Sequence, residues 1–258
     1  MDSIMVLDVG NSNTKIGIFV GPSLAHHWRI STVQERTTDE LGMVIAGLVQ
    51  SAGVVRNQLA GVVISSVVPP IMPAIERMCK QYFGITPLIV GPGVRTGLDI
   101  KADSPREVGV DRIVNAISAV AQYGPPLIIV DFGTATTFCV VDALGHYVGG
   151  AIAPGVRTSA DALFESAAKL PRVELARPKT VIGKNTVTGV QSGVVYGFAS
   201  LVDGMVEHIA RELPLPYTVV ATGGLAELIA PESKCISHIH PLLTLEGLRI
   251  VWERNRER

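Results

Sequence analysis

The sequence predicts an α/β protein made of two copies of one unit, each with the element order βββαβαβ. Two apolar runs end in an Asp-x-Gly turn, at Asp8–Gly10 and at Asp131–Gly133, and each turn is followed by another apolar run. The segments after each turn then follow in the same order, which indicates an internal duplication. With 258 residues, of which 47% are hydrophobic, the chain can bury the cores of two domains of about 100–150 residues each.

In the first half, the expected strands are short apolar runs between turn-forming residues. They are Ile4–Leu7, Ile16–Phe19, Leu24–Ser31, Gly61–Ser65 and Pro87–Val90. Thr37–Glu40 forms a capping box that should start a helix. This helix is expected to bury one face, made of Leu41, Val44, Ile45 and Leu48. A second helix should end near Tyr82, and Gly91–Glu107 has no helix or strand period and reads as a long functional loop.

The second half repeats this order with one additional helix, after a connecting helix over Asp111–Tyr123 that should bury Ile113, Ala116, Ile117 and Val120. Its expected strands are Leu127–Asp131, Ala135–Asp142, Tyr147–Ala153, Thr218–Ala221 and one near Ile236. Its expected helices are Gly155–Lys169, Gly189–Glu212, a short one from Leu225, and Leu243–Asn255. We expect the domains to be residues 1–112 and 113–258.

Composition and charge disfavour several classes of function. The net charge is −1 and the basic residues form no run beyond the tail Glu253–Arg258, so nucleic acid is not an expected partner. Apolar runs are shorter than the roughly 18 residues that span a bilayer, and Asp2 stands where a signal peptide would carry a cation. The three cysteines lack CxxC spacing and are typical of a cytoplasmic protein with reduced thiols.

The first turn, Asp8–Lys15, has the composition of a phosphate-binding loop. Gly10 lets the backbone approach a phosphate closely, the residues Asn11, Ser12, Asn13 and Thr14 supply small donors, and Lys15 supplies a cation. Asp8 ends a buried strand and is placed to hold a metal-bound water or a cation. A solvated hairpin turn would show the same composition.

The second turn, Asp131–Thr137, repeats the pattern, so two facing loops could hold a nucleoside triphosphate and its metal from opposite walls of a cleft. The common nucleotide fingerprints are absent: Gly183–Thr186 lacks the rest of a P-loop, and Gly97 comes one residue too late after Gly91-Pro-Gly93. A third glycine-rich turn, Ala221–Leu225, fits either a ligand at a helix N-terminus or an ordinary turn.

Gly109–Arg112 places an acid and a guanidinium at the start of a helix. Asp111 could act as a base and Arg112 could pair with a substrate carboxylate; alternatively, Asp111 is an acid that stabilises the helix N-terminus. Gly149–Gly155 could form a surface of small residues against a substrate, or only a tight corner. The histidine pairs His26-His27 and His238-x-His240 lack carboxylate neighbours in the sequence and are weak metal candidates.

Six motifs together resemble the type III pantothenate kinase family, in order over nearly the whole chain. They are Asp8-Val-Gly-Asn-Ser-Asn-Thr-Lys15, Gly91-Pro-Gly-Val-Arg-Thr-Gly97, Gly109-Val-Asp-Arg112, Asp131-Phe-Gly-Thr-Ala-Thr136, Gly149-Gly-Ala-Ile-Ala-Pro-Gly155 and Thr244-Leu-Glu-Gly-Leu248. The resemblance implies the acetate kinase and actin-like ATPase fold, with two ribonuclease H-like domains and a nucleotide cleft between them.

The resemblance also implies roles for individual positions. Asp8, Val9, Gly10, Asn11, Ser12, Asn13, Thr14 and Lys15 would form the first ATP phosphate loop, with Asp8 holding Mg²⁺ through water, and Thr134 would be a second ATP contact. Asp131 would bind K⁺ or NH₄⁺. Gly109, Val110, Asp111 and Arg112 would bind pantothenate, with Asp111 as the base, and Thr186 would reach the substrate from the partner subunit of a homodimer. Ala102 stands where many members have Tyr, which puts one pantothenate-packing contact in doubt.

The implied function is ATP-dependent phosphorylation of pantothenate to 4'-phosphopantothenate, the first step of coenzyme A biosynthesis, by a cytoplasmic homodimer that needs neither nucleic acid nor membrane. Two alternatives stay open from the sequence. One is another phosphotransferase of the acetate or sugar kinase type. The other is a regulatory homologue that binds nucleotide without catalysis.

Overall fold

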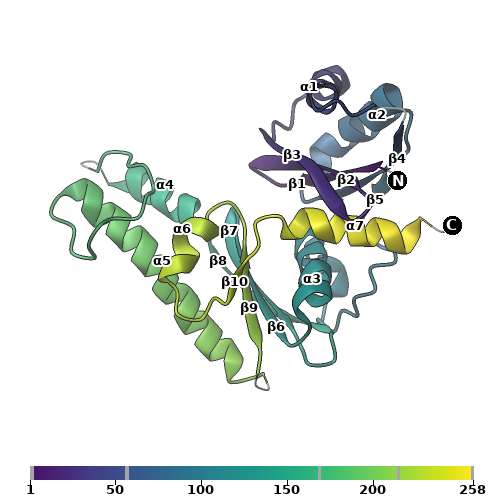
Figure 1. The fold of residues 1–258 in the computed structure, drawn as a ribbon. Helices are drawn as coiled ribbons and strands as arrows, with labels where there is room; N and C mark the ends of the chain where they lie inside the picture. The colour runs from purple at the N-terminus through teal and green to yellow at the C-terminus, as the bar shows by residue number, and fades with distance from the viewer. Residues whose placement is uncertain (1–2, 56–57, 168–169, 214–215, 257–258) are drawn as a thin grey trace. The chain divides into compact units, whose positions relative to one another are not determined.

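The structure is a computed structural model that describes residues 3–55, 58–167, 170–213 and 216–256. The chain forms two compact units (Figure 1). Unit 1 comprises Met1–Leu98, Ser104–Ser118 and Leu243–Arg258, and unit 2 comprises Asp99–Asp103 and Ala119–Leu242. No helix of the described residues is long and apolar enough to cross a membrane.

Unit 1 contains a five-stranded mixed sheet in the order β3-β2-β1-β4-β5. Its strands are β1 (Ser3–Val9), β2 (Asn13–Val20), β3 (Ser23–Ser31), β4 (Leu59–Ser66) and β5 (Leu88–Ile89). The first three form an antiparallel meander, whereas β4 runs parallel to β1 and β5 runs parallel to β4. The central strand β1 therefore has one antiparallel and one parallel neighbour.

Helices cover both faces of the sheet of unit 1. They are α1 (Thr38–Ser51), α2 (Met72–Phe83), the first part of α3 (Val110–Tyr123) and α7 (Leu243–Asn255), with short 3-10 helices η2 (Pro69–Ile71) and η3 (Pro105–Glu107). Alternate residues of β1, such as Met5 and Leu7, share one core with α1 and α2. The opposite face packs against α7, where Trp252 fills the space above Gly61.

The capping box that starts α1 is confirmed, because Thr37 accepts from the Glu40 amide and the Glu40 side chain accepts from the Thr37 amide. The predicted inward position of Val44 is wrong, since this residue is 38% exposed. The buried face is rotated toward Gly42 and Ala46. A Cβ at Gly42 would overlap the Tyr82 ring, so the close approach of α2 on that side decides which face is buried.

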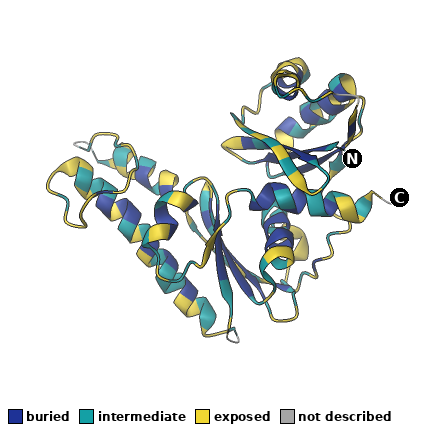
Figure 2. Cartoon of the chain, viewed as in Figure 1, coloured by how far each residue is buried: buried dark blue, intermediate teal, exposed yellow. Residues whose placement is uncertain are grey.

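Unit 2 contains a second five-stranded mixed sheet, in the order β10-β9-β6-β7-β8. Its strands are β6 (Leu127–Phe132), β7 (Ala135–Val141), β8 (Tyr147–Pro154), β9 (Thr218–Thr222) and β10 (His238–Ile239). Its helices include α4 (Val156–Ser166), α5 (Thr186–Ala210), α6 (Ala226–Ile229) and the 3-10 helix η4 (Ala230–Glu232). One face of the sheet shares a core with α4, α5 and α6, and these buried residues are dark blue in Figure 2.

The two sheets have the same topology, which confirms the predicted duplication. In each, a three-stranded antiparallel meander is extended by two parallel strands beside its first strand. Small differences from the predicted boundaries have local causes. Helix α5 begins at Thr186 because Asn185 caps it, and α4 ends at Ser166, while Ala168 and Lys169 lie outside the described residues.

Two segments belong to a different unit from the residues directly before them in the sequence. Leu243–Arg258 is part of unit 1, and Asp99–Asp103 is part of unit 2, where Ile100 forms a parallel bridge with Tyr147. The amide of Lys101 donates to the Tyr147 carbonyl at 2.8 Å. A domain boundary between residues 112 and 113 stays a prediction.

Candidate active site

Asp8 lies near the end of the central strand of unit 1, where three strands bring polar side chains together. It pairs in register with Lys15 on β2 and with Ser65 on β4. The Ser65 hydroxyl donates to Asp8 Oδ1 at 2.8 Å, and Lys15 Nζ lies 3.7 Å from Asp8 Oδ2. Both carboxylate oxygens of Asp8 therefore face a positively polarised group.

Asp8 is only 8% exposed, and this burial raises the pKa of its carboxyl group. The charge of Lys15 and the Ser65 hydroxyl oppose this rise, while the nearby charge of Asp111 adds to it. A buried carboxylate is costly unless it is paired with a cation or hydrogen-bonded. The environment of Asp8 therefore favours a positive charge close to this carboxylate.

The turn after Asp8 is closed by backbone hydrogen bonds. The Gly10 amide donates to the Asn13 carbonyl at 3.0 Å, and the Thr32 amide donates to the Ser12 carbonyl at 3.1 Å. The side chains of residues 11–13 are exposed, so a ligand can reach them from solvent. Thr14 is instead buried, with its hydroxyl 2.8 Å from that of Thr32, and Val9 packs in the core.

Asp111 lies in the first turn of α3, with its carboxylate turned back over Gly109. A Cβ at Gly109 would come 2.5 Å from Asp111 Oδ1, and this oxygen accepts from the Arg112 amide at 2.9 Å. Glycine at position 109 is therefore needed for this side-chain position. The charge of Asp111 acts on the pKa of Asp8, so the structure brings these two predicted site residues of unit 1 into one electrostatic neighbourhood.

Asp131 occupies in unit 2 the position that Asp8 occupies in unit 1. It pairs in register with Thr137 on β7 and with Thr222 on β9. Thr222 is fully buried and its Oγ1 has no hydrogen-bond partner among the residues that the structure describes. A Cβ at the next residue, Gly223, would overlap Asp131 Oδ1. Asp131 and Thr222 are thus register partners on neighbouring strands, and the backbone at Gly223 approaches Asp131 too closely for any side chain at that position.

Thr134 and Thr186 lie elsewhere in unit 2. The Thr134 carbonyl accepts from the Thr158 hydroxyl at 2.8 Å, and Gly155 lies so close that a Cβ there would overlap this carbonyl. Thr186 is exposed in the first turn of α5. It is surrounded in sequence by exposed apolar side chains, those of Val181, Ile182 and Val187.

Two residues were not singled out by the sequence, Ser65 as a partner of Asp8 in unit 1 and Thr222 as a neighbour of Asp131 in unit 2. Each lies at the end of the parallel strand beside a central strand, Ser65 as the next-to-last residue of β4 and Thr222 as the last residue of β9. Because the carboxyl ends of parallel strands meet at the same edge of a sheet, a search for hydroxyl residues at the ends of these two strands would have found both.

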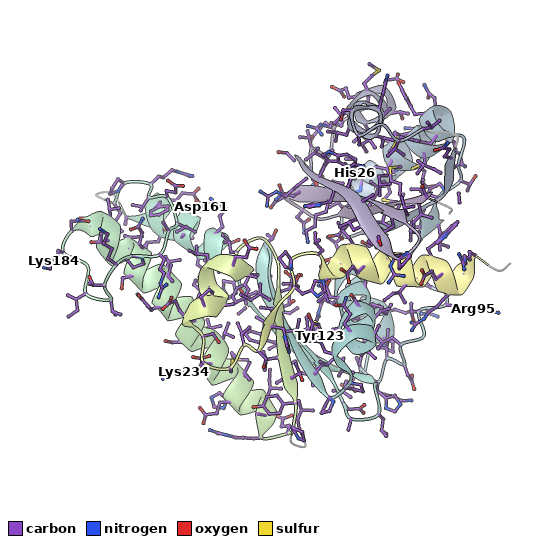
Figure 3. All side chains as sticks on the ribbon, in the orientation of Figure 1. His26, Arg95, Tyr123, Asp161, Lys184 and Lys234 are labelled. Carbon is purple, nitrogen blue, oxygen red and sulfur yellow. The ribbon has the colours of Figure 1, made fainter. Side chains whose placement is uncertain are left out.

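Three histidines of the two pairs, His26, His238 and His240, make aromatic contacts. His26 stacks on Trp28, with ring centroids 5.8 Å apart. Tyr123 stacks on His238 at 4.7 Å and its hydroxyl lies 2.9 Å from His240 Nδ1; Figure 3 labels His26 and Tyr123. Among the described residues, no group of three or more His, Cys, Asp or Glu side chains is placed to hold a metal ion.

A duplicated mixed sheet with an aspartate near the end of each central strand defines the class of the protein, the actin-like ATPase fold. Solved structures of low sequence identity share it. The activator of the 2-hydroxyisocaproyl-CoA dehydratase from Clostridium difficile, with bound ADPNP, has a TM-score of 0.59 at 14% identity, with 99% of this chain and 98% of that chain covered. The polyphosphate/ATP-glucomannokinase from Arthrobacter has a TM-score of 0.50 at 14% identity, with full coverage of both chains.

The sequence comparisons narrow this class to one family. The model of the type III pantothenate kinase family matches residues 4–208. A type III pantothenate kinase of Geobacillus kaustophilus is 56% identical over 99% of this chain and 99% of the relative. One of Exiguobacterium is 53% identical over 98% of this chain and 100% of the relative. The chain belongs to the type III pantothenate kinase family, and is an ATP-dependent enzyme that phosphorylates pantothenate in coenzyme A biosynthesis.

Proposed function

We propose that phosphoryl transfer to pantothenate is carried out by Asp8, Asp111 and Asp131 in three different roles. Asp8 holds Mg²⁺ through water, Asp111 accepts the hydroxyl proton of the substrate, and Asp131 binds a monovalent cation. The observation that carries the proposal is the arrangement around the buried Asp8, which Ser65 and Lys15 contact and whose pKa the nearby charge of Asp111 raises. Two carboxylates in one neighbourhood suit a reaction that joins a metal-bound phosphate to an alcohol.

The surroundings of Asp8 fit a hydrated Mg²⁺ ion. Magnesium keeps several waters and is held by one or two carboxylates together with substrate phosphates, so a group of three protein ligands is not required. Bound there, Mg²⁺ would neutralise the developing charge on the phosphates. In the proposed site, Lys15 and the exposed side chains and amides of Asn11–Asn13 bind the same phosphates, and Thr134 supplies a second contact to ATP.

The surroundings of Asp131 fit K⁺ or NH₄⁺. The supporting observation is the buried Thr222 hydroxyl, which has no hydrogen-bond partner within the described part of the chain. Thr222 is the register partner of Asp131 on the neighbouring strand. A buried hydroxyl without a partner is unfavourable, and a large cation with oxygen ligands would satisfy it. The ion would add a positive charge close to the ATP phosphates.

In the proposed reaction, the segment Gly109–Arg112 binds pantothenate. Arg112 pairs with the substrate carboxylate, and Asp111 accepts the proton of the primary hydroxyl. The hydroxyl oxygen forms a bond to the γ-phosphorus while the bond to the β,γ-bridging oxygen breaks, and ADP leaves with that electron pair. General-base catalysis of this kind contributes about 10²–10⁴-fold to the rate.

The chain acts as a homodimer in this proposal, and Thr186 reaches the pantothenate of the partner subunit. The exposed apolar residues near the start of α5, with Ile182 81% and Val181 61% exposed, support a protein partner on this surface. A sedimentation experiment at assay concentrations tests the dimer, and a fully active monomer would contradict it. The cytoplasmic location remains a prediction of the sequence.

The base is tested by the kinetics of Asp111→Asn in a coupled assay with pantothenate, ATP, Mg²⁺ and K⁺. We expect kcat to fall by about 10²–10⁴-fold while the KM for ATP changes little. Glu107→Gln is the matched control, since it removes a nearby exposed negative charge from a residue with no proposed role. Near-normal kcat of Asp111→Asn, with a slightly lowered Tm, would assign Asp111 to helix stability instead.

A further inference from the structure

A buried hydrogen bond joins the last helix of the chain to the helix that carries Asp111. Thr244 Oγ1 on α7 donates to Asn115 Oδ1 on α3 at 2.8 Å, and each residue is only 2% exposed. Asn115 follows Asp111 by four residues, so the two side chains lie on the same side of α3, one turn apart. The contact at Asn115 therefore lies one turn from Asp111, on the same side of α3.

The backbones of α3 and α7 meet one turn further along α7. A Cβ at Gly247 would overlap the carbonyl oxygen and side chain of Val114, so only glycine permits this approach. The backbone contact sets the distance between the helices, and the Thr244–Asn115 hydrogen bond sets the rotation of α3 about its own axis. Figure 1 shows α7 passing across α3.

The same helix α7 also packs on the strands that surround Asp8. The Leu245 side chain lies against Gly17 of β2, and the Trp252 ring lies against Gly61 of β4. These two strands carry Lys15 and Ser65, the two partners of Asp8. One helix thus contacts both the strands that hold Asp8 and the helix that carries Asp111, all within unit 1.

We propose that Thr244 is a positioning residue for phosphoryl transfer, which acts through Asn115 to hold Asp111 at a set place relative to Asp8. The inference rests on the proposed role of Asp111 as the base. A proton acceptor displaced by about 1 Å can lose a large part of its rate contribution. The hydrogen bond between α7 and α3 prevents such a displacement.

The direct test compares Thr244→Val with Thr244→Ser. Valine has a similar shape but no donor, whereas serine keeps the hydroxyl. We expect Thr244→Val to lower kcat by about 10-fold with little change in the KM for ATP, and Thr244→Ser to restore most of the turnover. Unchanged kcat in Thr244→Val, or failure of serine to restore turnover, would overturn the positioning role. Should Thr244→Val not fold, Thr244→Ala removes the same hydroxyl without adding a buried methyl group.

A control variant separates positioning from a general loss of stability. Ile75→Val removes one buried methylene group from the core on the opposite face of the same sheet, where Ile75 is 2% exposed. We expect it to lower Tm while kcat, measured well below the Tm of every variant, stays at the wild-type value. An equal loss of kcat in Ile75→Val would overturn the inference, because turnover would then follow stability alone.

The double variant with Asp111→Asn shows whether Thr244 acts through Asp111. If it does, Thr244→Val adds no further loss of kcat once Asp111 is replaced. If Asp111→Asn alone lowers kcat and the losses of the two single variants add in the double variant, Thr244 does not act through Asp111. The positioning role would then be overturned, while Asp111 would remain the base. Normal turnover of Asp111→Asn alone would overturn the proposed base and this inference with it, so the two failures give different results.

Discussion

Asp8 and Asp131 occupy the same position in two copies of one sheet, yet their neighbours differ. Asp8 has a lysine on its antiparallel neighbour and a serine on its parallel neighbour. Asp131 has threonines at both positions, followed by Gly223. The duplication preserves the carboxylate and the topology, while the neighbouring residues determine which ligand each copy suits.

The neighbours of the two aspartates suit different cations. In the proposed site, a hydrated Mg²⁺ ion would take the place of Lys15 beside Asp8 when nucleotide binds, because both cations are compatible with the same carboxylate. Around Asp131 the strands supply hydroxyl oxygens, which are ligands for a weakly hydrated monovalent cation. The same turn in the two copies thus gives a candidate phosphate site in unit 1 and a candidate ion site in unit 2.

Among the changes that separate the surroundings of Asp8 from those of Asp131, removing the charge of Asp8 should have the largest effect. Asp8→Asn should lower kcat/KM for ATP by about 10²–10³-fold, the range seen when one group that stabilises transition-state charge is lost. Initial rates against Mg–ATP concentration measure this effect, and the loss should be the same in K⁺ and in NH₄⁺. If Asp8→Asn had the wild-type kcat/KM for ATP, the proposed difference in role between Asp8 and Asp131 would be contradicted.

The next effect concerns the backbone beside Asp131. Gly223 has a φ of +96° and a Cβ there would overlap Asp131 and Phe132, so Gly223→Ala should cost about 2–4 kcal/mol of unfolding free energy. Gly133→Ala is the matched control, because a Cβ there would meet its nearest atom at an ordinary 3.5 Å. Chemical denaturation compares the two, and equal stabilities would show that the chain near Asp131 is not tightly packed.

The monovalent cation should change the rate by about 10-fold, equivalent to roughly 1.4 kcal/mol of barrier. We expect high activity in K⁺ or NH₄⁺ chloride and low activity in Na⁺ or Li⁺ chloride. Thr222→Val should reduce this difference, since it removes the buried hydroxyl beside Asp131, while Ser65→Ala should leave the preference among cations intact. Equal rates of the wild-type enzyme in all four salts would contradict an ion site at Asp131.

The smallest expected effect is that of Lys15 on stability. Lys15→Met should cost about 1 kcal/mol at pH 7, because a partly exposed ion pair contributes little. Burial raises the pKa of Asp8 above its ordinary value of 3.8, so the unfolded chain loses this proton first. Stability therefore falls as the pH rises from about 4 toward the folded pKa, and Lys15 reduces that fall.

The cost of Lys15→Met should accordingly shrink when the pH is lowered to 4 or below, which thermal unfolding at several pH values measures. Arg29→Met is the control, since Arg29 is an exposed cation opposite Lys15 on β3. A cost of Lys15→Met that is the same at every pH would show that Lys15 does not act through the charge of Asp8.

Much of the fold could be predicted from local patterns. The helix Leu243–Asn255 and the Thr37 capping box were predicted with their observed bounds, because periodicity and cap residues act within a few neighbouring positions. Val44 was placed wrongly for a related reason, since periodicity shows that a helix is amphipathic but not toward which side its partner lies.

The candidate site divides in the same way. Asp8, Asp111 and Asp131 could be found from the turn and helix-start patterns around them, since each stands where a local element begins or ends. Ser65 could not be found in this way, because it lies 57 residues from Asp8 and reaches it only through the parallel pairing of β1 and β4. The same holds for Thr222, whose relation to Asp131 depends on the pairing of β6 and β9.

The sequence by itself determined the duplicated α/β architecture, the two Asp-x-Gly turns and the family, because strand and helix periods and motif spacing are local properties of the chain. Only the tertiary structure decided that the last helix belongs to unit 1 and that Thr244 bonds Asn115 across 129 residues of sequence. Such contacts follow from how buried faces pack against one another, and packing depends on the shapes of side chains that are distant in sequence.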